Sequence, residues 1–153
     1  MKKFKILFLA SLLVSCADPI QEDLIDYVNN GILPLIESEE EITTLIDMMG
    51  EMDDDALTYE LLENSILPMT REYLEQLQAV RPATPEVREL HEMAIEIWTL
   101  KERGLIQIYA AYEEEDMTMI TAALESIAES TKFERRFENK LESLMVAHDV
   151  EIL

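Results

Sequence analysis

Apolar residues recur at intervals of three or four positions along most of the chain, the period of one face of an α-helix. No segment alternates apolar and polar residues between turn residues, as a strand would. The pattern therefore predicts an all-α protein with four long helices. The residues expected to face the core are Ile20, Leu24, Val28, Ile32, Leu35, Ile42, Leu45 and Met49 in the first helix, Leu62, Ile66, Met69, Tyr73, Leu77 and Val80 in the second, Leu90, Ala94, Ile97, Leu105, Ile108 and Tyr112 in the third, and Ile120, Leu124, Ile127, Phe133, Phe137, Leu141 and Leu144 in the fourth.

Capping and helix-breaking residues divide this pattern into its helices. The first helix is expected to start at Asp18-Pro19, with Gln21 as the partner in a capping box, and to end at Gly50. The other boundaries are Asp53-Asp54-Asp55 before the second helix, Thr84-Pro85 before the third, and a break at residues 113–116 before the fourth. Because the connections are short, an antiparallel up-down four-helix bundle over residues 19–153 is the expected architecture.

One motif occurs twice. Asn30-Gly31-Ile32-Leu33-Pro34-Leu35 recurs as Asn64-Ser65-Ile66-Leu67-Pro68-Met69. A proline deprives the carbonyl four residues earlier of its hydrogen bond, so the motif predicts a kink in each of the first two helices. The two prolines are at similar distances in sequence from the turn between these helices, so the two kinks are expected to lie side by side. The alternative is a true break at residues 29–31, which would give five or six shorter helices.

The first 16 residues have the features of an export signal. Lys2, Lys3 and Lys5 precede an apolar run that is too short to span a bilayer. The run ends in Leu13-Val14-Ser15-Cys16, which is similar to the lipobox of bacterial lipoproteins. The resemblance implies that residues 1–15 are a cleaved signal peptide and that residues 16–18 form a lipidated N-terminus. It further implies a diacylglycerol on Cys16 and an N-terminal acyl chain such as palmitate. The alternative is a plain secretory signal in which the cysteine occurs by chance.

A second resemblance covers less than half of the chain. It rests on Tyr27-Val28-Asn29, Leu33-Pro34, Ile66-Leu67-Pro68, the run from Arg81 to Val87, and Leu90-His91. These residues resemble a group of helical-bundle lipoproteins from Bacillus-type and related bacteria. The resemblance supports a lipid anchor and a bundle, and it implies no functional residue because no activity is assigned to the group.

Charge narrows the possible partners. The chain has 33 acidic and 12 basic residues, and the signal segment contains three of the basic ones and none of the acidic ones. Nucleic acid is excluded as a partner, because phosphate contacts require a surplus of lysine and arginine. Anionic headgroups would also repel the folded part. Attachment to the cell membrane or outer membrane, on the extracytoplasmic side, is therefore expected to depend on lipid at Cys16.

Two acidic clusters are the strongest candidates for a binding surface. They fall in the first and third connections, which an up-down bundle places at the end distant from the lipid. They could dock a basic protein or bind a divalent cation weakly, or they could be solvated turns that place negative charge at helix N-termini. The clusters consist of Glu51, Asp53, Asp54 and Asp55, and of Glu113, Glu114, Glu115 and Asp116.

Methionines and aromatic residues provide weaker candidates. Met49, Met52, Met117 and Met119 fall at the same end, where thioethers could bind a soft ion such as Cu(I) or fill gaps in the core. His91 and Trp98 lie seven residues apart in the third helix and could contact a ligand, or they could be core residues. In the fourth helix, Lys132, Arg135, Arg136 and Lys140 could meet lipid headgroups or glutamates of the first helix.

No motif indicates catalysis. The single cysteine lies in the lipobox, and the chain has no nucleophile elbow and no glycine-rich phosphate loop. Positions 88 and 145 are arginine and methionine, so neither histidine belongs to the Glu-x-x-His motif of di-iron bundles. The expected function is a non-catalytic binding module without a cofactor. It would engage a basic protein, as an immunity or exclusion lipoprotein would. The alternative is a lipoprotein that binds a small ligand or metal.

Overall fold

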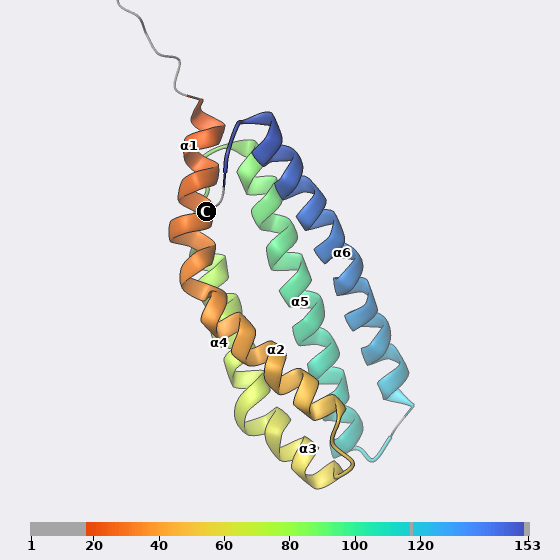
Figure 1. The fold of residues 1–153 in the computed structure, drawn as a ribbon. Helices are drawn as coiled ribbons and strands as arrows, with labels where there is room; N and C mark the ends of the chain where they lie inside the picture. Colours follow the sequence, from red (N-terminus) through yellow and green to blue (C-terminus); the bar gives the residue numbers. More distant parts are fainter. Residues whose placement is uncertain (1–17, 117, 152–153) are drawn as a thin grey trace, which may run out of the picture.

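The computed structural model describes residues 18–116 and 118–151, and all regular structure in these residues is helical (Figure 1). The prediction of an all-α protein with four long helical stretches is confirmed. The first stretch contains α1 (Pro19–Asp26), the π-helical turn η1 (Tyr27–Ile32), the 3-10 turn η2 (Leu33–Leu35) and α2 (Ile36–Gly50). The second contains α3 (Asp55–Leu61), the π-helical turn η3 (Leu62–Ile66) and α4 (Leu67–Ala79); the third is α5 (Pro85–Glu113) and the fourth is α6 (Met119–Ala147).

Two of the expected N-caps are formed by aspartates. Asp18 Oδ1 accepts hydrogen bonds from the backbone N–H groups of Ile20 and Gln21, and Asp54 Oδ1 accepts them from Ala56 and Leu57. The predicted capping box is wrong. The amide of Gln21 donates to the carbonyl of Asp149 at 3.2 Å, because the chain beyond α6 folds back onto α1 and offers an acceptor there.

The repeated proline motif is built into two wide helical turns. Leu33 and Leu67, which precede the prolines, donate to the carbonyls of Val28 and Leu62, five residues earlier. In a wide turn of this kind the N–H groups donate to carbonyls five residues earlier, so the helix can continue past a proline, which has no N–H group to donate. The backbone remains helical through both segments, so the chain does not break at residues 29–31.

The two prolines do not lie side by side as expected. Pro34 lines a hollow together with Gln76, Ala79 and Val80, near the end of α4, rather than beside Pro68. Counting residues from the turn assumed that both helical stretches start level. Figure 1 shows instead that α3 begins further toward the end of the molecule than the point where α2 stops. The second helical stretch is therefore shifted along the long axis of the molecule relative to the first helical stretch.

The core forms three hydrophobic clusters along the long axis. Figure 1 shows the start of α1, the start of α5 and the end of α6 at one extremity, and the α2–α3 and α5–α6 connections at the other. The packing between α5 and α6 is the most extensive, and α4 also packs on α5. The clusters are centred on Leu24, Leu90 and Leu144 at the first extremity, on Ile42, Tyr73 and Trp98 in the middle, and on Leu62, Ile66 and Leu105 toward the second.

One core assignment in the fourth helix is wrong. Leu124 was expected to face inward but is 57% exposed, whereas Ala123, Ser126 and Ser130 are buried. The reason is the close approach of α5 and α6. A Cβ atom added to Gly104 would lie 3.1 Å from the backbone oxygen of Ala123. Only small side chains fit between helices at this separation, so α6 turns its small residues toward α5.

Asp23 joins α1 to the start of α5. Its carboxylate accepts hydrogen bonds from the backbone N–H groups of Ala83 and Thr84 and from the hydroxyl of Thr84, at 2.9, 2.8 and 2.6 Å. Burial opposes the charged form of this carboxylate, but the three donors outweigh it, and the pKa of Asp23 is lowered. Thr84 and Pro85 start the third helix as predicted, and the side chain of Thr84 donates to Asp23 and makes no capping hydrogen bond to α5.

Candidate functional site

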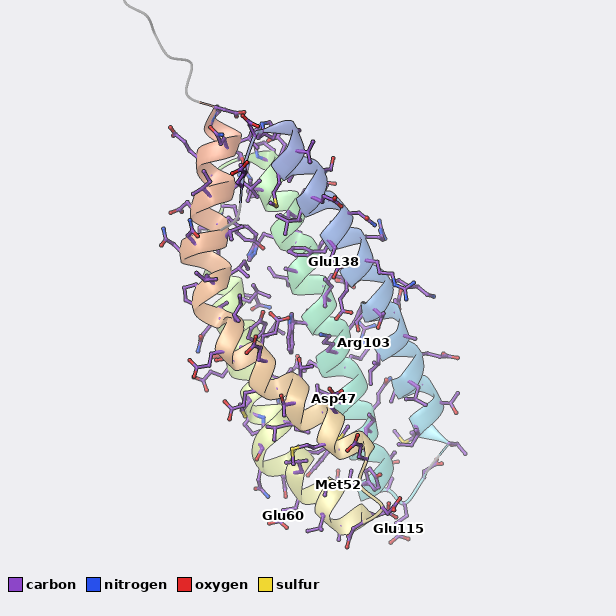
Figure 2. The ribbon with its side chains drawn as sticks, viewed as in Figure 1. Asp47, Met52, Glu60, Arg103, Glu115 and Glu138 are labelled. Atoms are coloured by element: carbon purple, nitrogen blue, oxygen red, sulfur yellow. The ribbon has the colours of Figure 1, made fainter. Side chains whose placement is uncertain are left out.

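A groove at the end formed by the α2–α3 and α5–α6 connections brings the two acidic clusters together. The groove has a volume of about 620 Å³, and we call it the apex groove. Its polar lining consists of Asp55 and Tyr59 from α3, Tyr112 and Glu113 from α5, and Glu115 from the following connection. Figure 2 shows Met52 and Glu115 at this same end of the molecule. Carboxylates from separate parts of the sequence thus share one concave surface with two tyrosines.

The eight carboxylates predicted for this surface have different roles. Asp55, Glu113 and Glu115 line the apex groove. Two others bond to nearby groups: Asp54 caps the start of α3, and Asp116 accepts from the N–H and hydroxyl of Thr118 in the connection before α6. The hydrogen bonds from Thr118 lower the pKa of Asp116. The remaining three are exposed in the two connections and do not line the groove, namely Glu51, Asp53 and Glu114.

A left-handed residue shapes one wall of the apex groove. Glu115 has φ of 54°, and the N–H groups of Glu115 and Asp116 donate to the carbonyls of Tyr112 and Ala111. This is the Schellman arrangement that ends many helices, with glutamate at the position that usually holds glycine. A side chain costs about 1–2 kcal/mol in this conformation. The arrangement holds the Glu115 side chain at the groove.

Tyrosines next to the groove were not identified from the sequence. The rings of Tyr59 and Tyr109 stack with centroids 4.8 Å apart, and their hydroxyl oxygens are 2.7 Å apart. The hydroxyl of Tyr109 also donates to Glu63 at 3.3 Å, and its hydrogen bond with Tyr59 raises the pKa of Tyr109. Helical periodicity gave no signal for this pair, because the two tyrosines come from helices that are distant in sequence.

The methionines proposed as copper ligands are partly buried. Met49 packs against the hydrophobic cluster nearest the apex groove, as expected for a residue that fills the core. Met52 and Met119 are also half-buried, and Met117 lies outside the described residues. In the described part of the chain, no three histidine, cysteine, aspartate or glutamate side chains are placed to hold a metal ion together.

His91 and Trp98 are both core residues. His91 is 6% exposed and meets the ring of Tyr27 edge-on, with centroids 5.6 Å apart. Among the residues that the structure describes, its Nδ1 atom and the hydroxyl of Tyr27 are buried without a hydrogen-bond partner. Burial lowers the pKa of His91, so the neutral ring is favoured. Trp98 is 3% exposed and contacts Tyr73 rather than His91.

Lys140 and Arg136 of α6 contact residues other than the expected glutamates of the first helix. Lys140 forms an ion pair with Glu89 of α5 at 2.8 Å, not with a glutamate of the first helix. Arg136 lies over the ring of Phe133 at 5.0 Å, while Lys132 and Arg135 are exposed. The reason is the arrangement of the helices, since α6 packs along α5 and not along α2.

The extremity opposite the groove contains the first described residue. The predicted signal peptide of residues 1–15, the segment similar to a lipobox and Cys16 lie outside the described residues. Asp18 is within them, and its Oδ2 atom lies 2.6 Å from Nδ1 of His148, a contact that lowers the pKa of Asp18. Within the described ranges, no helix is long and apolar enough to cross a membrane.

Comparison with protein-family models, with curated proteins and with solved structures finds no match for the chain. The resemblance to bacterial lipoproteins thus remains a prediction from the residues that carry it. The arrangement of the described side chains is the remaining basis for a functional proposal.

Proposed function

We propose that the protein is a lipid-anchored extracytoplasmic lipoprotein that acts as a non-catalytic binding module and engages a basic protein partner through the apex groove. Two features support this function. The similarity of residues 13–16 to a lipobox gives a means of attachment at the chain's N-terminal end. The apex groove lies at the other extremity of the folded part, where it would face away from the membrane.

The lining of the apex groove is the observation that carries the proposal. Asp55, Glu113 and Glu115 surround a hollow that is also lined by Tyr59 and Tyr112. Carboxylates form charge-assisted hydrogen bonds with lysine and arginine, and tyrosine rings attract the same cations through their faces. The net charge of −21 would also speed the encounter with a basic protein. A concave surface of this composition suits a protruding basic side chain.

We interpret the four helical stretches as an up-down bundle in which the first two are kinked at the proline turns. The wide turns at Tyr27–Ile32 and Leu62–Ile66 are the support for the kinks. In such a bundle, the anchor and the groove are separated by the length of the molecule. A helix of 29 residues, such as α5, is about 44 Å long at a rise of about 1.5 Å per residue.

Charge reversal in the groove tests the binding function. Asp55, Glu113 and Glu115 are changed together to lysine in the full chain, and capture of partner proteins is measured by cross-linking on the membranes of its own host. We expect capture to fall at least about tenfold, because lysines at these positions repel a basic surface and remove its ion pairs.

A control variant with the same change in net charge distinguishes the effect of the groove residues from the effect of the protein's overall negative charge. Glu51, Asp53 and Glu114 are changed together to lysine, since they lie in the same connections but outside the groove. Asp54 and Asp116 remain unchanged because Asp54 caps α3 and Asp116 is bonded to Thr118. The proposal fails if both triple variants capture equally well, or if the unchanged protein captures no basic protein.

Removal of the thiol tests the anchor. Cys16→Ser abolishes the only site in the chain for a thioether-linked lipid, so we expect the protein to leave the membrane fraction. Incorporation of labelled fatty acid should be lost at the same time. Ser15→Ala keeps a small residue before the cysteine and should be processed normally. A Cys16→Ser protein that still fractionates with membranes would refute the lipid anchor.

A further inference from the structure

A second cavity lies midway along the molecule, between α2 and α6. In the described part of the chain, these two helices make few close backbone approaches to each other. The cavity has a volume of about 230 Å³. Its wall includes side chains from four helices, and those that matter for its chemistry are Glu39 of α2, Tyr73 of α4, Trp98 of α5, and Glu134, Phe137 and Glu138 of α6.

The floor of this cavity is aromatic. The rings of Tyr73 and Trp98 have centroids 4.2 Å apart at an interplanar angle of 43°, and each residue is only 3% exposed. Phe137 adds a third ring from α6. Electron-rich ring faces attract cations, and the attraction is stronger where water is excluded. The floor is therefore suited to an organic cation with an apolar part rather than to an anion.

Carboxylates approach the same cavity from both sides. Glu39 is fixed by the hydroxyl of Tyr73, which donates to its Oε2 atom at 3.0 Å. Glu134 and Glu138 are four residues apart on α6, so they lie on the same face of that helix. Figure 2 shows Glu138 on the part of α6 that borders the space between the helices. The cavity thus combines an aromatic floor with three acidic groups.

The protein already places one of its own ammonium groups against this wall. Nζ of Lys101 lies 4.4 Å from the centroid of the Trp98 ring and 2.8 Å from Oε1 of Glu134. Lys140 and Arg136 of α6 contact Glu89 and Phe133 instead. Lys101 therefore balances Glu134, while Glu39 and Glu138 keep two negative charges in the cavity wall.

From this arrangement we infer that the cavity is a binding site for a small organic ammonium ion. The ammonium group lies between Glu39 and Glu138, and its alkyl part contacts Tyr73, Trp98 and Phe137. The site is independent of the apex groove and shares no residue with it. It takes a cation with a short alkyl chain, because the cavity volume is small and its floor is apolar.

The only tryptophan of the chain lies in the cavity floor, so its fluorescence reports directly on binding. The full chain, purified in an uncharged detergent, is titrated with putrescine, with tetramethylammonium and with the neutral analogue butanediol. We expect a saturable change in Trp98 fluorescence with at least one of the two cations and none with butanediol. Binding of one cation and not the other distinguishes a primary from a quaternary ammonium site.

Variants define which groups bind the cation. Glu39→Gln with Glu138→Gln should weaken binding at least about tenfold, because two charge-assisted contacts are lost while glutamine can still accept from Tyr73. Lys101→Met should strengthen binding, because it removes the competing ammonium and frees Glu134. Glu142→Gln with Glu151→Gln removes the same number of charges outside the cavity and should change the affinity less than about twofold.

Three outcomes would overturn the inference. They are a fluorescence change that does not saturate, an equal loss of affinity in the cavity variant and the Glu142 and Glu151 control, and an equal response to butanediol. Each would mean that the acidic surface only collects counter-ions or that the cavity does not discriminate charge. Circular dichroism on every variant ensures that only folded proteins are compared. Failure of this test would leave the apex groove experiment unaffected, since the two sites use different residues.

Discussion

Replacement of Leu24 by alanine is expected to lower the free energy of unfolding by about 2–5 kcal/mol. Leu24 is 0% exposed and packs with Val87 and Leu90 of α5 and with Leu144 of α6. Truncation removes apolar contacts and leaves a cavity that neighbours from three helices cannot fill. Urea denaturation of the purified variant measures the effect.

The next residue provides the control for Leu24. Ile25 is 42% exposed on the same helix, and Ile25→Ala should cost less than about 1 kcal/mol because little apolar surface is removed from contact. The two substitutions change the helix propensity of α1 in the same direction. Equal losses at both positions would mean that α1 is not docked on the remaining helices as described.

The Gly104→Ala substitution is expected to destabilise the protein by about 1–2 kcal/mol, although alanine is the better helix former by about 1 kcal/mol. The added Cβ would lie 2.7 Å from Cγ1 of Ile127 and 3.1 Å from the backbone oxygen of Ala123. The oxygen belongs to the backbone of α6 and cannot rotate away. The two helices must therefore separate along their most extensive contact, and thermal unfolding should occur at a lower temperature.

Gly50→Ala is the matched substitution without a steric conflict. Gly50 is the last residue of α2, and a Cβ there would meet no atom within 4 Å. Alanine should stabilise the protein by about 0.5–1 kcal/mol, because glycine loses more backbone entropy on folding. A stabilising effect at both glycines would contradict the close approach of α5 and α6.

The start of α1 and the apex groove lie toward opposite ends of the folded part, and the cavity lies between them. Asp18, the first described residue, is held at its end by the cap it forms and by its contact with His148. The folded part therefore begins two residues after Cys16. Lipid on Cys16, as proposed, would therefore attach the protein near the end of the folded part that is opposite the apex groove.

The sequence by itself determined the class of fold and the positions of the helix ends. Periodic apolar residues and capping aspartates act locally, so the starts at Asp18 and Asp54 and the last residue of α2, Gly50, could be predicted. The repeated proline motif also marked where the regular backbone hydrogen bonding of the first two helical stretches would be interrupted. These features depend on hydrogen bonds and side chains within a few residues of one another.

Contacts between helices could be decided only by the tertiary structure. Periodicity placed Leu124 inward, but the separation of α5 and α6 at Gly104 turned Ala123 inward instead. The hydrogen bonds that Thr84 donates to Asp23, and the cavity that Glu39 and Trp98 both line, bring together residues about 60 positions apart. Of the two acidic clusters, only Asp55, Glu113 and Glu115 reach the same groove. Such pairings depend on the offset and rotation of whole helices, which are set by how side chains from distant segments pack and not by local periodicity.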